Sequence, residues 1–288
     1  MYTIFIVRKI AALNQRRHNS APMNDRAQEL GFILAALLVS ILVLPCLAQT
    51  AEAGQNEKGP SNPVQFNVGT DLVSRYIWRG KDYGNSPAIQ PNLSFSYAGL
   101  KIGVWGSYCF VYRENLGNYA EFDPYISYTW KWFTLGITDY FYPNGITPNE
   151  NNAYFNYNSK TTGHTFEACL TYTGPEKFPL QVYAGTLIYG ADKGKDSTGV
   201  YGLGTKNNYS TYFEVSYSFQ LKGIGVKPFV GGIPFGSGWY GPYGGVVNAG
   251  LTISKSIRIS KEYELPVYAS VISNPQAQNV FLVFGISL

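Results

Sequence analysis

The sequence predicts an all-β protein, a transmembrane antiparallel β-barrel of about twelve strands with long extracellular loops and short periplasmic turns. Three observations lead to this fold class. Apolar and polar residues alternate with a period of two over most of 64–288. The connections between the alternating segments are long and short in turn. After residue 53, no segment approaches the roughly 18 consecutive apolar residues of a membrane-spanning helix.

The N-terminal part has the pattern of an export signal. The uncharged apolar stretch Leu30–Leu44 is shorter than the roughly 20 residues of a spanning helix, and small-residue cleavage sites follow it at Ala48 and Ala53. We expect translation to begin at Met23, because a start at Met1 makes the leading region too long. A membrane anchor and a lipid-modified Cys46 are the alternatives.

The predicted organisation therefore has three parts. Residues 1–53 are an N-terminal extension plus signal peptide, 54–63 are a short periplasmic linker, and 64–288 are the barrel.

The composition excludes several classes of protein. Charged residues make up 14% of the chain and aromatic residues 16%, which argues against disorder and against a coiled coil. The net charge is +4 and the basic residues form no cluster, so we expect no nucleic-acid partner. Only 2 His and 2 Met are present, and we expect no metal site and no cofactor.

The alternating segments place the strands in chain order. They are expected near 64–78, 87–97, 100–112, 119–130, 132–142, 163–173, 179–190, 209–221, 226–236, 244–256, 263–273 and 279–288. Their apolar rows are typified by Phe66 and Val68, Leu93 and Phe95, Ile102 and Val104, Ile126 and Tyr128, Leu135 and Ile137, Ala168 and Leu170, Leu180 and Val182, Phe213 and Val215, Val247 and Leu251, Val267 and Ala269, and Leu282 and Phe284. The pattern is weakest in 226–236, where Pro228 and Pro234 interrupt it.

Alternation also fits a soluble sandwich, which buries its apolar face. Two features favour a barrel with its apolar face outward. Long and short connections alternate strictly, and the polar rows contain many small residues, as a narrow lumen requires: Gly69, Ser94, Ser96, Gly103, Ser107, Gly185, Ser216 and Ser218. In hydrocarbon every backbone polar group needs a partner, so the sheet must close.

Charged residues on the polar rows are the candidates for lining the lumen. They are Asp71, Arg75, Glu121, Asp123, Glu167 and Glu214. Carboxylates along a polar channel favour cations. The alternative is a lumen plugged by paired charges, with Arg75 beside a carboxylate. Twelve strands lie between the filled eight-stranded barrel and the open sixteen-stranded porin, so any pore should be narrow.

Aromatic and basic residues near the strand ends suggest membrane-interface anchors. Those expected in such girdles are Tyr76, Trp78, Tyr97, Trp130, Trp132, Tyr140 and Tyr142. Arg79 is expected to anchor the outer rim beside Trp78, with contacts to lipopolysaccharide phosphates as the alternative. His164 is also expected at the interface. A lipid hydrolase with a His–x–Ser pair is disfavoured because position 166 is Phe.

Several motifs resemble the TorF-type porins, a family of bacterial outer-membrane barrels. They are Val73–Gly80 (VSRYIWRG), Ser86–Tyr97 (SPAIQPNLSFSY), Gly99–Tyr108 (GLKIGVWGSY), Gly136–Pro143 (GITDYFYP) and Asn274–Leu288 (NPQAQNVFLVFGISL). The resemblance covers about 64–288 and implies a terminal strand that the assembly machinery reads. The candidate assembly signals are Phe284, Ile286 and Leu288; the last replaces the usual terminal aromatic residue.

The predicted function is a narrow passive channel for small polar solutes in the bacterial outer membrane, without enzymatic activity. Its expected partners are outer-membrane lipid and lipopolysaccharide, the outer-membrane assembly machinery and the solutes. The alternatives are a closed structural or surface-binding barrel and, less favoured, an outer-membrane lipid hydrolase.

Overall fold

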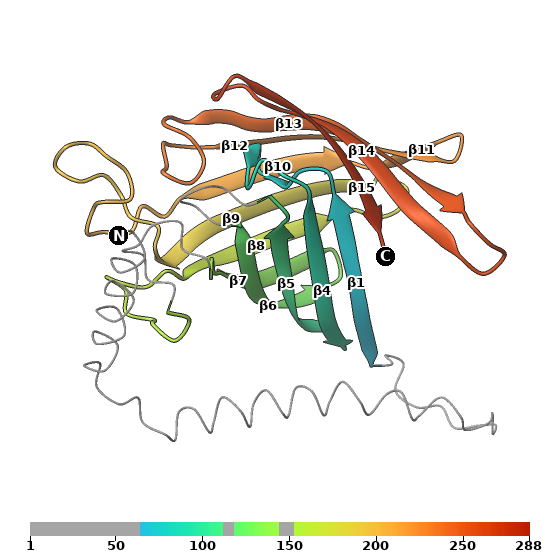
Figure 1. The fold of residues 1–288 in the computed structure, drawn as a ribbon, viewed down its shortest axis with the longest axis horizontal. Coiled ribbons are helices and arrows are strands. Elements are labelled where there is room, and N and C mark those ends of the chain that lie inside the picture. Colours follow the sequence, from blue (N-terminus) through green and yellow to red (C-terminus); the bar gives the residue numbers. More distant parts are fainter. Residues whose placement is uncertain (1–63, 112–117, 144–152) are drawn as a thin grey trace, which may run out of the picture. The chain divides into compact units, whose positions relative to one another are not determined.

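The computed structural model describes residues 64–111, 118–143 and 153–288, and the predicted leader and linker lie outside these ranges. The described chain is built from β-strands (Figure 1). Within the same ranges, no helix combines the length and apolar character needed to cross a membrane.

One antiparallel sheet forms the wall of the molecule. Its strands are β1 (Gln65–Val73), β4 (Ala88–Tyr97), β5 (Leu100–Cys109), β6 (Ala120–Trp130), β7 (Phe133–Tyr140), β8 (Thr165–Thr173), β9 (Leu180–Gly190), β10 (Thr211–Tyr217), β11 (Phe219–Leu221), β12 (Ile224–Ile233), β13 (Gly245–Arg258), β14 (Glu264–Asn274) and β15 (Asn279–Ser287). Strands β10 and β11 are successive parts of one wall strand, since both pair with β12. The predicted count of about twelve strands is confirmed.

The sheet closes on itself. From β4 to β10 and from β11 to β15 each strand pairs with the next one in the chain, β1 pairs with β4 and β15, and β10 also pairs with β12. The β1–β15 ladder is short and joins Asp71–Val73 to Gly285–Ser287. No strand of this described wall is therefore left as an open edge along its whole length, and the predicted barrel is confirmed.

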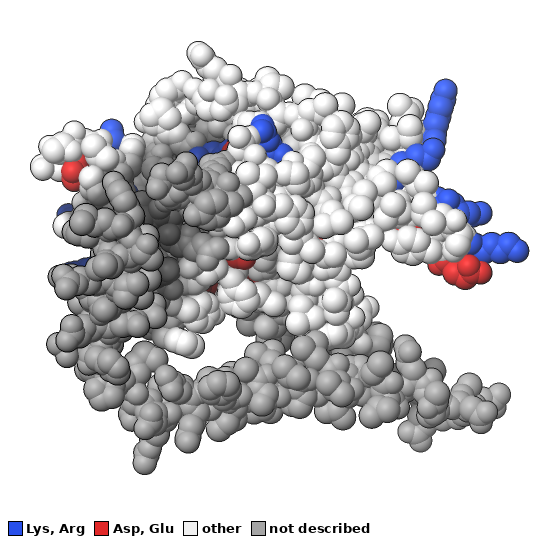
Figure 2. Space-filling model, viewed as in Figure 1, with Lys and Arg blue, Asp and Glu red and all other residues white. Residues whose placement is uncertain are grey.

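The alternation sorts side chains to the two faces of the wall. Outward rows expose large apolar residues such as Leu135, Leu170 and Leu282, whereas inward residues such as Ser94 and Glu167 are buried. Figure 2 shows a surface with few charged side chains on the barrel, and with Lys and Arg gathered at the end where the short turns after β11 and β13 lie. This is the inverse of a soluble protein's distribution.

The wall departs from strict alternation beside the weakest predicted strand. The register of β12 against β13 shifts between Gly231 and Gly232, and a β-bulge of this kind reverses the facing of the residues beyond it. Val247 consequently faces inward and is fully buried, although its period-two pattern with Leu251 predicted an outward side chain.

The largest difference from prediction lies in the first segment, expected to run over 64–78. Strand β1 ends at Val73, and Ser74 terminates the ladder: its backbone N–H donates to the carbonyl of Phe284, while its hydroxyl accepts from the N–H of Phe284. The chain then leaves the wall and forms a hairpin of β2 (Ile77–Trp78) and β3 (Lys81–Asp82), drawn in teal in Figure 1. Arg79 and Gly80, with φ of 50° and 77°, form its two-residue turn.

Candidate functional site

The β2–β3 hairpin lies inside the barrel and touches opposite parts of the wall. The side-chain amide of Asn274, on β14, donates to the carbonyl of Gly80 over 3.2 Å. A Cβ added at Gly80 would lie 2.0 Å from the carbonyl oxygen of Val247 on β13. Arg79 reaches Glu167 on β8. The turn of the hairpin therefore spans the lumen at this level, from β8 on one side to β13 and β14 on the other.

An ion pair fixes the tip of the hairpin. The two guanidinium nitrogens of Arg79 donate to the two carboxylate oxygens of Glu167 over 2.6 and 2.8 Å, a bidentate arrangement. The side chains of Arg79 and Glu167 are 8% and 1% exposed. Removing one partner of a buried pair leaves an uncompensated charge, which costs about 3–5 kcal/mol.

Tyrosine hydroxyls complete this ion pair. Tyr140 and Tyr183 donate to Glu167 over 2.8 and 2.6 Å, and the hydroxyls of Tyr183 and Tyr240 accept from Arg79 over 2.7 and 2.5 Å. The carboxylate thus keeps two donors that do not belong to the hairpin. These donors fix its orientation independently of Arg79.

Aromatic rings surround the Arg79 guanidinium. Its central carbon lies 4.3 Å from the centre of the Trp78 ring, 4.6 Å from Tyr212, 5.1 Å from Tyr183 and 5.5 Å from Tyr240. Ring faces at these distances attract a cation, and more strongly where water is excluded. We call Glu167 together with Tyr140, Tyr183, Tyr212 and Tyr240 the cation cage.

Charge at the hairpin follows from burial and from the neighbouring oxygens. Burial lowers the pKa of Arg79, but Tyr240 and Glu167 raise it by more, and it stands above its ordinary value. Burial lowers the pKa of Lys81, whose ammonium donates to the carbonyl of Trp239 over 2.8 Å. Burial also raises the pKa of Tyr240. The cage therefore holds a charged guanidinium beside a neutral phenol.

A second buried cluster lies on the wall near the hairpin. Glu121 and Asp123 of β6 are 6% and 3% exposed. The hydroxyl of Tyr119 donates to Glu121 over 3.0 Å, and the N–H of Phe141 donates to Asp123 over 3.3 Å. The rings of Tyr76 and Tyr83 pack with Tyr119 on this side of the hairpin.

The loops at the long-loop end are tied together by a separate polar cluster. Asp192 accepts from the hydroxyl and the N–H of Ser210, over 2.6 and 2.8 Å, and the hydroxyl of Ser237 donates to that of Ser210 over 2.6 Å. Burial raises the pKa of Asp192, against the lowering effect of the Ser210 hydrogen bonds. This cluster joins the β9–β10 and β12–β13 connections. Ser237 also exchanges two backbone hydrogen bonds with Gly241, and Tyr240 lies in the turn between them.

His164 differs from its predicted position at the membrane interface. It is fully buried, with Nδ1 2.8 Å from Asp139 and Nε2 2.6 Å from the carbonyl of Tyr154. Its ring stacks between Phe141 and Tyr157, with centroids 4.5 and 4.3 Å away. Both ring nitrogens face oxygen acceptors, so neither is placed to activate a nucleophile.

The structure places the six predicted lumen residues in different surroundings. Glu167 is in the cage, Glu121 and Asp123 form the second cluster, and Glu214 accepts from Tyr212 over 2.5 Å. Asp71 lies on β1 in register with Ser287. Arg75 has left the wall and pairs with Asp82 over 3.5 Å.

Four aromatic residues and one arginine were predicted at the rim and are found inside. Tyr76 is buried beside Trp105, Trp78 packs against Tyr140 and Tyr240, and Tyr142 packs against Tyr119. For Tyr76, Trp78 and Arg79 the prediction is wrong because the chain leaves the wall after Ser74, where strand alternation no longer fixes facing. Tyr140 is still part of wall strand β7 and shares the inward parity of Gly136, and Tyr142 lies just beyond the end of that strand. Of the remaining predicted girdle residues, Tyr97, Trp130 and Trp132 are exposed.

Neither the predicted assembly residues nor a metal-binding set forms part of this site. Phe284 and Leu288 are exposed, as large apolar side chains of the last strand and its end. Their role in assembly stays a prediction. Among the described residues, no cluster of three or more His, Cys, Asp and Glu side chains could hold a metal ion.

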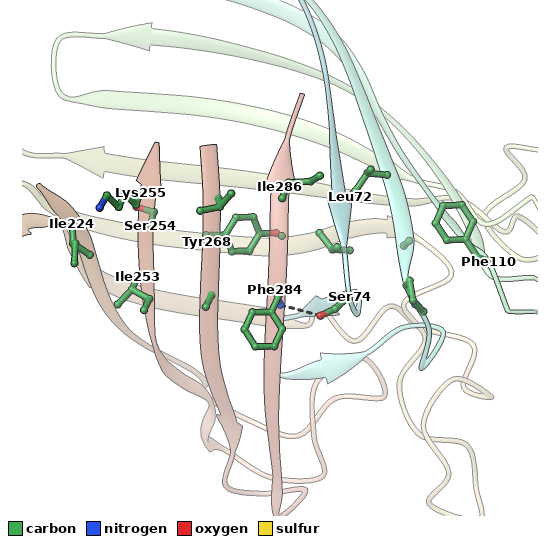
Figure 3. Close-up of a pocket in the computed structure, with 16 residues that line it drawn as sticks. Leu72, Ser74, Phe110, Ile224, Ile253, Ser254, Lys255, Tyr268, Phe284 and Ile286 are labelled. Carbon is green, nitrogen blue, oxygen red and sulfur yellow. Dashed lines mark hydrogen bonds between the residues drawn. The ribbon is translucent and has the colours of Figure 1, made fainter. Parts of the chain in front are cut away.

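An apolar hollow of about 690 Å³ lies at the seam between β15 and β1 (Figure 3). Leu72, Ile253, Phe284 and Ile286 contribute to its lining, and they belong to the outward rows of the wall. Apart from Lys255 and a few hydroxyls its lining is apolar, so it offers little to orient a polar solute. The lumen is the better candidate for function.

The comparisons place the chain in a family. Residues 57–231 match the family described as a bacterial protein of unknown function (Gcw_chp), and the chain belongs to this family. Among solved structures it is similar to the COG4313 outer membrane channel from Pseudomonas putida F1, with 10% sequence identity and a TM-score of 0.41, over 82% of this chain and 98% of that chain. A search of curated proteins finds no match.

Proposed function

We propose that the protein is an outer-membrane β-barrel that forms a narrow passive channel for small polar solutes, and that the β2–β3 hairpin closes the channel in the conformation described above. The observation that carries the proposal is the closed barrel itself, with apolar residues outward and carboxylates and hydroxyls inward. A polar interior inside an apolar wall is the arrangement of a solute path through lipid.

The outer-membrane location rests on physical grounds. A barrel satisfies every backbone polar group without a free edge, as hydrocarbon requires. The predicted signal peptide would export the chain, and the resemblance of Val73–Gly80 to TorF-type porins agrees with this location. The proposed partners are outer-membrane lipid and lipopolysaccharide around the wall, and the assembly machinery during insertion.

The hairpin is a separable part of the structure, which favours a channel over a permanently closed barrel. Strands β2 and β3 pair only with each other in a small sheet of their own, while the wall sheet closes without them. The contacts of the hairpin with the wall come from side chains and the Gly80 carbonyl. Withdrawing it would leave the wall ladder intact.

The alternative is a closed structural or surface-binding barrel, and the near-complete burial of the Arg79–Glu167 pair favours it. Conductance in a planar bilayer separates the two functions. We expect Arg79→Ala to conduct more than wild type, because it removes the ion pair that holds the hairpin. Arg258→Ala is the matched control, since Arg258 is 76% exposed and pairs with Glu264 outside the lumen. Folded Arg79→Ala protein without openings would support the closed barrel.

We propose no enzymatic activity. A barrel-wall hydrolase needs a serine within reach of a base, and the described surroundings of His164 present Asp139, a backbone carbonyl and aromatic rings instead. Lipase activity that is lost in His164→Ala would overturn this view.

A further inference from the structure

We propose that the cation cage is a binding site for small solutes that carry a guanidinium group, and that Arg79 occupies it as an internal ligand while the channel is closed. The transport of such solutes rests on the proposed channel function, but the binding itself does not.

The carboxylate has the geometry of a guanidinium receptor. Its two oxygens accept from the two terminal nitrogens of Arg79 over 2.6 and 2.8 Å, so the plane of the ligand is matched to the plane of the carboxylate. An ammonium is a point charge and would use only part of this fork. The site therefore favours guanidinium over a primary amine.

Most of the cage is held by the wall and not by the hairpin, although the hydroxyl of Tyr240 accepts from Arg79. Glu167 keeps hydrogen bonds from Tyr140 and Tyr183, which lie on wall strands β7 and β9. Tyr212 is held by hydrogen bonds to Glu214 and from the side-chain amide of Asn248, over 2.5 and 2.9 Å. Without the Arg79 side chain, the Glu167 carboxylate and the rings of Tyr183 and Tyr212 would remain on the wall around the place of the guanidinium.

The chemistry of the cage selects the sign of the ligand. The face of an aromatic ring attracts cations, and the Glu167 carboxylate repels anions. A neutral solute of the same shape could donate to the Tyr183 and Tyr240 hydroxyls, as Arg79 does, but would leave the buried carboxylate without a counter-charge. A solute in the lumen must also displace Arg79, which the turn of the β2–β3 hairpin holds in place.

Chemical rescue of Arg79→Ala tests the site directly. The variant, folded in detergent micelles, is titrated with methylguanidinium chloride in a calorimeter, with urea as the neutral probe of similar shape. We expect methylguanidinium to bind at least about tenfold more tightly than urea, because a charge-assisted bond is worth more than a neutral one. Arg79→Ala/Glu167→Gln should weaken methylguanidinium binding by about tenfold or more and leave urea binding nearly unchanged.

If Arg79→Ala does not fold alone, the same comparison is made on refolding yield, which methylguanidinium and not urea should restore. Equal effects of methylguanidinium and urea, or binding that survives Glu167→Gln, would overturn the proposal. A variant that binds methylguanidinium but never conducts would remove the channel function and leave the binding site standing. A variant that conducts but does not bind methylguanidinium would support the channel function and overturn the binding site.

Discussion

The Arg79–Glu167 pair gives the sharpest prediction, which concerns the stability of Glu167→Gln. The substitution keeps the volume of the side chain and removes its charge. Arg79 then stays 8% exposed without an anion, and unlike a carboxyl group it cannot shed its charge by releasing or taking up a proton. We expect the free energy of unfolding to fall by about 3–5 kcal/mol.

Arg79→Ala should cost less than Glu167→Gln. The carboxylate it leaves behind keeps the hydroxyl donors of Tyr140 and Tyr183, and it can also take up a proton. In the double variant the two costs should not add, since either substitution alone breaks the same pair.

The measurement is urea-induced unfolding from phospholipid vesicles, followed by tryptophan fluorescence. Glu264→Gln is the matched control, because Glu264 is 52% exposed and its pair with Arg258 should be worth about 0–1 kcal/mol. Raising the salt concentration should reduce the difference for the exposed pair and leave that for the buried pair nearly unchanged. If Glu167→Gln and Glu264→Gln destabilise equally, the buried pair does not hold the hairpin as argued.

Three further predictions test the hairpin, the facing and the last strand. Gly80→Ala should destabilise the protein and raise its conductance, because the added Cβ would lie 2.0 Å from the carbonyl oxygen of Val247. Gly223→Ala is the control, since Gly223 has the same φ of 77° and a Cβ there would meet nothing within 4 Å. An equal loss of stability in the two variants would exclude the Val247 contact as the cause. Leu170→Lys, on an outward row, should lower the free energy of unfolding from vesicles by about 2–4 kcal/mol, and Gln181→Lys, on an inward row, should lower it much less. Equal losses in the two variants would refute the assigned facing. Deleting Phe284–Leu288 should prevent assembly, as judged by surface labelling, and normal surface levels would contradict a role for this strand.

The wall could be predicted from the sequence because its physics is local. A period of two fixes the facing of a strand residue, and with it the inward positions of Glu121, Asp123 and Glu167. The same rule failed at Val247, since a bulge is not encoded in the alternation.

The hairpin could not be predicted in the same way. Tyr76 and Trp78 continue the alternation beyond the last wall residue, so the sequence does not mark where the chain leaves the sheet. The one available signal was Arg79-Gly80 between residues able to pair, which fits a two-residue turn. Even with that turn, the contact between Arg79 and Glu167 could not be inferred from the local sequence, because the two residues are 88 positions apart.

The ion pair at the hairpin tip positions the hairpin and does not hold the wall together. The wall closes through its own backbone ladder, so a buried salt bridge is not needed to hold the barrel together. Apolar contacts alone would stabilise the hairpin in proportion to the area they bury, but they are not directional and would not fix its orientation. A bidentate pair holds the hairpin in one orientation, and its two side chains are only 8% and 1% exposed. On this reasoning the backbone ladder closes the wall, and the Arg79–Glu167 pair fixes the position of the hairpin within it.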